Sequence, residues 1–109
     1  MTPDEVAAFL ATLPGCRQKG TRAVPAWYVA NRIVARLVAH DELMIRCAFD
    51  VRERLVTEHP DTFGIPPAYE AHMKVQAMLY GDSGAIQSAL REAWELQRKM
   101  AGRARPRPA

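Results

Sequence analysis

The segment Gly81-Asp82-Ser83-Gly84 places a serine beside glycines, the residue types from which a tight turn can present a nucleophile. A nucleophilic serine also needs a histidine that accepts its proton, a carboxylate behind that histidine and donors for the oxyanion. A chain of 109 residues offers no scaffold for that set. A turn that leads into a helix N-cap explains the same residues. We therefore expect no catalytic residue here and no enzymatic activity.

Histidines and cysteines are scattered along the chain. His40, His59 and His72 are not spaced to hold one metal from a single helix, and no other ligand pattern completes a set. Cys16 and Cys47 do not form a CxxC pair, so we expect two reduced, packed thiols. Glycine-rich phosphate loops and dinucleotide motifs are also missing from the sequence. We expect neither a metal nor a cofactor.

One group of side chains in the proline-rich segment 60–73 has unusual neighbours. Glu70 stands two residues from His72, where a carboxylate can change the pKa of an imidazole, and Tyr69 precedes them. These three residues define an alternative site, a cleft beside the loop for a protein segment or a small ligand. The simpler interpretation is that they share an exposed loop.

Cationic and aromatic residues recur at alternate positions of the apolar segments. If these segments are strands, period-two alternation puts Tyr28, Arg36, Arg46, Lys74 and Tyr80 on one face of a sheet. The arginines and the lysine would contact phosphates, and the tyrosines would stack on bases. Few of these groups can read base edges, so the expected partner is DNA, bound with low specificity. A solvated sheet face is the other interpretation.

The surrounding sequence supplies the elements that would hold this face. Thr2-Pro3-Asp4-Glu5 has the pattern of a helix N-terminus, which predicts a helix over residues 3–13. The segment 15–25 contains glycines and cations without a period, which predicts a loop. Its candidates for anion contacts are Arg17, Lys19 and Arg22.

Three strands joined by hairpins are expected next, at 27–29, 33–38 and 43–48. Burial favours one register, with the pairs Ile33–Cys47, Ala35–Ile45 and Leu37–Leu43 on an apolar face. The opposite face then holds Val34, Arg36, Met44 and Arg46.

The second half of the chain predicts a helix, a loop, a strand and a helix. Asp50 is the expected N-cap of a short helix, and the segment 60–73 after it is a loop. Residues 74–80 alternate like a strand. The final helix is expected over residues 82–100, where Gly102 stops it.

This order of elements is that of an α+β domain, an antiparallel sheet with helices packed on one face. The other face stays uncovered unless something binds it. Trp27 and Trp94 are expected to anchor the core. Because 49% of the 109 residues are apolar and no long apolar run occurs, we expect a single soluble domain without a membrane partner. The N-terminal MTPDEV lacks a basic region followed by an apolar stretch, so we expect a cytoplasmic protein. We also expect a monomer or weak dimer.

The formal net charge of +3 is a property of the C-terminal end. Fifteen lysines and arginines, less Arg103, Arg105 and Arg107, leave twelve in residues 1–102, which also hold all twelve Asp and Glu. The segment 103–109 has little to bury and contains prolines, which predicts a disordered basic tail. Such a tail attracts any polyanion without selecting one.

Short motifs occur in a fixed order along the chain: TPDEV followed by LPG, WYV followed by NRIVARLV, then HPDTFGIPPAY, and ALREAWEL near the end. Together, over residues 2–100, they resemble the MmcQ/YjbR family. The resemblance implies a small α+β domain related to the CyaY-like shape and often labelled DNA-binding.

The chain departs from that family at two places. Members commonly have a Gly-Lys-type turn where this chain has Ala30-Asn31-Arg32, and a segment with Gly and Trp where it has Glu70-Ala71-His72-Met73. The acidic ridge with which CyaY-like proteins bind iron is reduced to Asp4 and Glu5, so iron binding is not expected.

Overall fold

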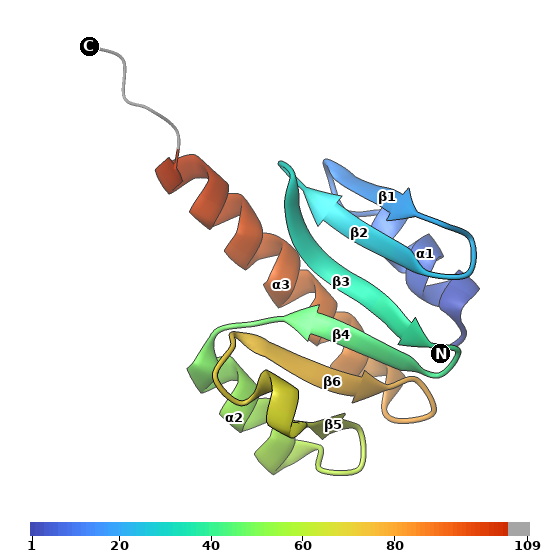
Figure 1. Ribbon diagram of the computed structural model, residues 1–109, viewed down its shortest axis with the longest axis vertical. Helices are drawn as coiled ribbons and strands as arrows, with labels where there is room; N and C mark the ends of the chain where they lie inside the picture. The colour runs from blue at the N-terminus through green and yellow to red at the C-terminus, as the bar shows by residue number, and fades with distance from the viewer. Residues whose placement is uncertain (105–109) are drawn as a thin grey trace.

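Six antiparallel strands and three α-helices make up the protein (Figure 1). The structure is a computed structural model and describes residues 1–104. Along the chain the elements are α1 (Pro3–Ala11), β1 (Cys16–Gly20), β2 (Pro25–Val29), β3 (Arg32–Ala39), β4 (Glu42–Arg46), α2 (Phe49–Glu58), β5 (Phe63–Gly64), the 3₁₀ turn η1 (Pro67–Tyr69), β6 (Lys74–Met78) and α3 (Ser83–Ala104). The strand order is β1-β2-β3-β4-β6-β5. The expected α+β class is confirmed.

The helices lie on one side of the sheet, with α3 crossing behind it and α1 and α2 beside α3 (Figure 1). The core lies between these layers, where strand residues such as Leu43, Ile45 and Val75 are fully buried. The two expected anchors are there as well, since Trp27 is 2% exposed and Trp94 is 9% exposed. The indole Nε1 of Trp94 donates to the carbonyl oxygen of Pro14 over 2.8 Å, which ties α3 to the turn between α1 and β1.

Local caps set the starts of two helices. Thr2 accepts a hydrogen bond from the backbone N–H of Glu5, and the Glu5 carboxylate accepts one from the backbone N–H of Thr2, so the expected capping box is present. Asp82 accepts from the backbone N–H of Ala85 at the start of α3. The expected cap at Asp50 is wrong, because α2 begins at Phe49 and Asp50 lies in its first turn.

Three expectations about segment bounds are also wrong. The loop expected over residues 15–25 contains β1, and the loop at 60–73 contains β5 and η1. The polar sequence of β1 shows no period because the strand lies at the sheet edge, where four of its residues are exposed. Helix α3 continues past Gly102 to Ala104, so the first residues of the expected tail are helical, and residues 105–109 lie outside the described part of the chain.

Two of the three expected cross-strand pairs are present, Ala35 with Ile45 and Leu37 with Leu43. A β-bulge at Val34 changes the rest of the pattern, because Trp27 pairs with Ala35 whereas Tyr28 pairs with Ile33. The extra residue turns Val34 into the core, where it is fully buried, and Ile33 is only half-buried. The expectation that Ile33 faces inward and Val34 outward is therefore wrong.

Candidate polyanion-binding surface

The surface to consider is the outer face of the sheet, defined as the face turned away from α3 (Figure 1). Side chains of directly paired residues share a face. One row across the outer face therefore consists of Lys19, Ala26, Arg36, Met44 and Gln76, each paired with the next. Two residues further along the same strands, the pairs are Arg17 with Tyr28 and Arg46 with Lys74.

The strands carry charge of almost one sign. Glu42 is the only carboxylate in the six strands that the structure describes. Helix α1 holds only acidic charges, α2 holds more acidic than basic residues, and α3 holds more basic than acidic ones. The strands thus concentrate positive charge that the rest of residues 1–102 balances in sequence. The strand cations are Arg17, Lys19, Arg32, Arg36, Arg46 and Lys74.

The outer-face cations have no anionic partner of their own. Within residues 1–104, the ion pairs closer than 4.0 Å are His40–Asp41, Arg52–Glu53 and Arg54–Glu92, and none of them involves an outer-face cation. A cation that is already paired with a carboxylate gains little binding energy from a further anion, whereas an unpaired cation can bind an anion without breaking an ion pair. This group of five is called the outer-face cations below: Arg17, Lys19, Arg36, Arg46 and Lys74.

The structure brings most of the nucleic-acid candidates together. Tyr28, Arg36, Arg46 and Lys74 all lie on the outer face. Tyr80 does not join them, because β6 ends at Met78 and Tyr80 lies in the turn that follows, 72% exposed. That turn is at the opposite end of β6 from Lys74.

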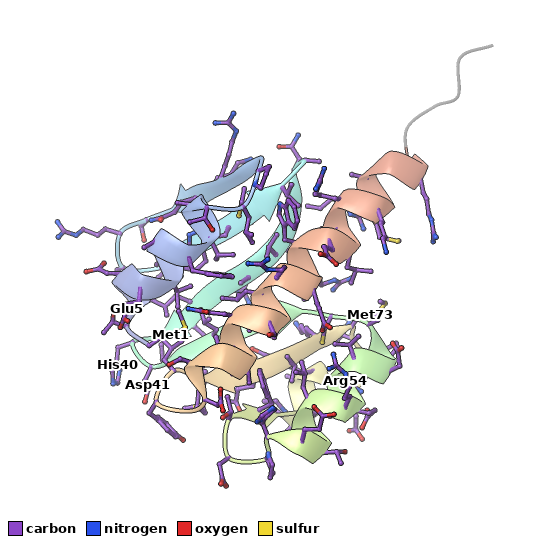
Figure 2. All side chains as sticks on the ribbon, turned by 180° about the vertical axis from the view of Figure 1, so that it is seen from behind. Met1, Glu5, His40, Asp41, Arg54 and Met73 are labelled. Carbon is purple, nitrogen blue, oxygen red and sulfur yellow. The ribbon has the colours of Figure 1, made fainter. Side chains whose placement is uncertain are left out.

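The two ends of the sheet differ in charge. Seen from the helix side in Figure 2, Met1, Glu5, His40 and Asp41 gather around one end, and Met73 lies near the other. Met73 directly precedes Lys74 in the sequence, so the cationic end of β6 is remote from the carboxylates of α1 and of the β3–β4 turn. An anion on the outer face is therefore attracted toward the Arg46–Lys74 end.

Part of the outer face is covered by the chain itself, which corrects the expectation of a fully uncovered sheet. The segment containing η1 lies beside β6 in Figure 1, and its Tyr69 ring carries the Lys74 ammonium over its face. Met44 points to this face and is nevertheless only 3% exposed. The face thus has a covered half over β4 and β6 and an open half over β1, β2 and β3.

Arg52 fixes the covering segment in place. This residue of α2 is only 5% exposed, and its guanidinium donates to the carbonyl oxygens of Tyr69, Glu70 and His72 over 2.8–3.2 Å. Its remaining face stacks on the Phe49 ring, with the guanidinium carbon 4.8 Å from the ring centroid. A buried guanidinium that donates to three carbonyl oxygens fixes the η1 segment, which is called the η1 ledge below.

The three residues of the alternative cleft consequently have different roles. Glu70 and His72 contribute backbone carbonyls to Arg52, and both residues are exposed. Tyr69 is half-buried, and burial, together with the Glu42 carboxylate, raises its pKa above the ordinary value, while Arg36 opposes the shift. Its phenol therefore lies within electrostatic reach of both side chains, above the outer face.

Two aromatic rings of the surface carry an ammonium group over their faces. The Nζ atom of Lys74 is 4.7 Å from the centroid of the Tyr69 ring, and that of Lys19 is 5.1 Å from the centroid of the Tyr28 ring. Each of these cation–π contacts occupies one face of its ring, which is then not available for stacking on a base. As arranged, the surface is better suited to phosphate contacts than to base stacking.

Sequence reasoning missed Arg52, although a signal was present. Arg52, Leu55 and Val56 follow the spacing of one helix face, so a cation stood within an apolar stripe. Arg17 and Lys19 were expected to contact anions from a loop, whereas the structure places them on strand β1, in register with Tyr28 and Ala26.

Two thiols and a serine are the other candidates that the sequence offered for chemistry. Burial raises the pKa of the Cys47 thiol to about 11, and burial also raises that of Cys16. Ser83 is the first residue of α3, beside the capping Asp82. Within residues 1–104, no three His, Cys, Asp or Glu side chains are grouped to hold a metal ion.

Comparison with known proteins gives a fold neighbour. No family model matches the chain, and no curated protein matches its sequence. The structure is similar to the crystal structure of protein DR2400 from Deinococcus radiodurans, which contains the domain DUF419, with a TM-score of 0.72 and 18% identity over 93% of this chain and 88% of that one. This likeness shows the fold alone. Among the described residues, no helix is long and apolar enough to cross a membrane.

Proposed function

We propose that this chain is a non-enzymatic domain of the MmcQ/YjbR-like family that binds DNA, or a similar polyanion, with low sequence specificity through its outer face. The family part of the proposal is supported by the motifs over residues 2–100 and by the fold neighbour, whose DUF419 domain is of the MmcQ/YjbR-like type.

The observation that carries the binding proposal is the separation of charge. The strands hold six cationic residues and one carboxylate, although residues 1–102 are balanced overall. Because the outer-face cations have no carboxylate partner, the phosphates of a nucleic acid can approach them without breaking ion pairs. Electrostatic contacts of this kind position a backbone and read no bases, which accounts for the low specificity.

Salt dependence is the first test of this function. If four or five phosphates are contacted, the logarithm of the binding constant for a short DNA duplex should fall against the logarithm of salt concentration with a slope of roughly −4. Fluorescence anisotropy over a salt series measures this slope. A slope near zero at measurable affinity would mean that the outer-face cations do not hold the ligand.

A matched pair of substitutions locates the surface. Arg36→Gln should reduce the slope by about one unit, because it removes one phosphate contact. Arg91→Gln is the control, since Arg91 is also exposed but lies on α3, over the Phe9 ring, on the helix side of the sheet. Equal effects of the two substitutions would assign binding to overall charge and not to the outer face.

A shortened chain separates the domain from its end. Removal of residues 105–109 takes away Arg105 and Arg107 and leaves every residue that the structure describes. We expect weaker binding with the Arg36→Gln effect preserved. If all binding disappears with these residues, the outer face is not the binding surface.

A further inference from the structure

Two like charges stand directly opposite each other at the edge of the η1 ledge. Arg46 ends β4 and Lys74 begins β6, and the two residues are cross-strand partners. Like charges in this relation are destabilising, and both side chains are half-buried, so water screens them incompletely. No carboxylate lies within 4.0 Å of either among residues 1–104. The free protein thus retains an unrelieved repulsion at this point.

A third cation and a hydroxyl group adjoin the pair. Arg36 is paired with Met44, two residues before Arg46 on β4, which makes Arg36 the diagonal neighbour of Arg46, at a typical separation of roughly 7–8 Å. The Tyr69 phenol comes from above, since its pKa is affected by Arg36 and its ring lies under the Lys74 ammonium. With its pKa raised, this phenol keeps its proton at neutral pH and remains a hydrogen-bond donor.

The ledge makes this arrangement a preformed site. Arg52 holds the backbone at Tyr69, Glu70 and His72 through partly buried hydrogen bonds to their carbonyl oxygens, so the phenol is not carried by a free loop. The four groups of the site come from three strands and from η1, and their polar ends are donors: two guanidinium groups, an ammonium and a phenol. The Glu42 carboxylate also lies within electrostatic reach of the phenol.

We propose that Arg36, Arg46, Lys74 and the Tyr69 hydroxyl form a subsite for a phosphate monoester, such as the terminal phosphate of a polynucleotide. A monoester carries a charge of about −1.5 to −2 at pH 7 and accepts hydrogen bonds on three oxygens, which matches several adjacent cations better than the single charge of an internal diester. This subsite rests on the proposed function and sharpens it, because it adds a preferred point of attachment on the same surface.

The experiment compares two single-stranded oligonucleotides of identical sequence, one with a 5′-phosphate and one with a 5′-hydroxyl, by fluorescence anisotropy with the full chain. We expect the phosphorylated strand to bind about tenfold more tightly. The difference should shrink as the pH falls below about 6, where the monoester loses its second charge. Equal affinities at pH 7 would overturn the subsite while leaving the general polyanion proposal intact.

Substitutions assign the difference to these residues. Lys74→Gln and Tyr69→Phe should each reduce the advantage of the phosphorylated strand. Lys19→Gln, the control on the open half of the face, should weaken both strands by the same factor. A control that removes the advantage as completely as Lys74→Gln would contradict the proposed location.

Inorganic phosphate distinguishes a failure of the subsite from a failure of nucleic-acid binding. Added phosphate should shift the NMR signals of Tyr69 and Lys74 in the absence of any oligonucleotide. Shifts without binding of either oligonucleotide would support the subsite for a small phosphorylated ligand and refute the nucleic-acid proposal. No shift, together with binding that ignores the 5′-phosphate, would refute the subsite alone.

Discussion

The two faces of the sheet use the same strands for opposite purposes. Toward the helices, alternate residues such as Trp27, Leu43 and Val75 are almost fully buried and pack into one core. On the outer face, the residues between them include the five outer-face cations, which have no carboxylate partner within 4.0 Å among residues 1–104. Burial of apolar side chains, and with it the stability of the fold, is concentrated on the helix side of the sheet. The outer face can therefore carry charges that the fold does not require.

The largest effect on the free energy of unfolding is expected from substitution of Trp27, on the helix side of the sheet. Trp27→Ala should lower the free energy of unfolding by about 3–5 kcal/mol, because it leaves a cavity in the core. Trp27→Phe is the matched control and should cost less, since the indole Nε1 has no hydrogen-bond partner to lose. Urea unfolding followed by circular dichroism measures both. A small loss in the alanine variant would show that this side of the sheet is not the stabilising one.

The next largest effect on the free energy of unfolding is expected at Arg52, which holds the η1 ledge over the outer face. Arg52→Met should cost about 3 kcal/mol, because it leaves the carbonyls of Tyr69, Glu70 and His72 without their buried donor. The pKa of Tyr69 should fall toward its ordinary value once the ring is less buried, which NMR titration detects. Arg54→Met removes an exposed ion pair with Glu92 and should cost less than about 1 kcal/mol. Equal losses in the two variants would contradict a specific role of Arg52.

A pH dependence is expected from the thiol on the buried face. The pKa of Cys47 is about 11 in the folded protein and near 9.0 in the unfolded chain, so above pH 9 the unfolded chain loses its proton first. Stability should therefore decline between about pH 9 and 11, by no more than about 1.4 kcal/mol per pH unit. Unfolding curves of the native chain and of Cys47→Ala test this, because the variant should lack that part of the decline. An identical decline in both would assign it to other groups.

The smallest effect on the free energy of unfolding is expected from a substitution on the outer face, and it has the opposite sign. Arg46→Gln should leave the free energy of unfolding unchanged or raise it by a few tenths of a kcal/mol, because it relieves the repulsion with Lys74. The same variant should bind DNA more weakly. Thermal unfolding and anisotropy on one preparation give both values. A destabilised Arg46→Gln would mean that the outer face does contribute to the fold, and the contrast between the faces would be lost.

Much of the fold could be predicted from local patterns, because the signals are local. The capping box at Thr2 and Glu5 needs only residues three apart, and the pairing of Ala35 with Ile45 follows from which residues must be buried. Where the environment is set from outside the segment, prediction failed. Strand β1 is polar because it is an edge, and the bulge at Val34 depends on how β2 and β3 fit together.

For the candidate surface as well, local sequence patterns predicted the strand residues but not the positions set by tertiary contacts. The alternation of the strands by itself put Arg36, Arg46 and Lys74 on one face. Tyr80 was grouped with them because the alternation continues past Met78, whereas the strand ends there. Only the structure brought Tyr69 over the same face, since the position of this loop depends on Arg52, which donates hydrogen bonds to its carbonyl oxygens.

By itself, the sequence determined the α+β class, most of the helices and strands, and a set of cations spaced to share one side of a sheet, because period and capping are properties of neighbouring residues. Only the tertiary structure decided that the charges separate in space and that Arg52 is buried. It alone placed Tyr69 beside Arg36 and Lys74, because these contacts join elements far apart in the chain.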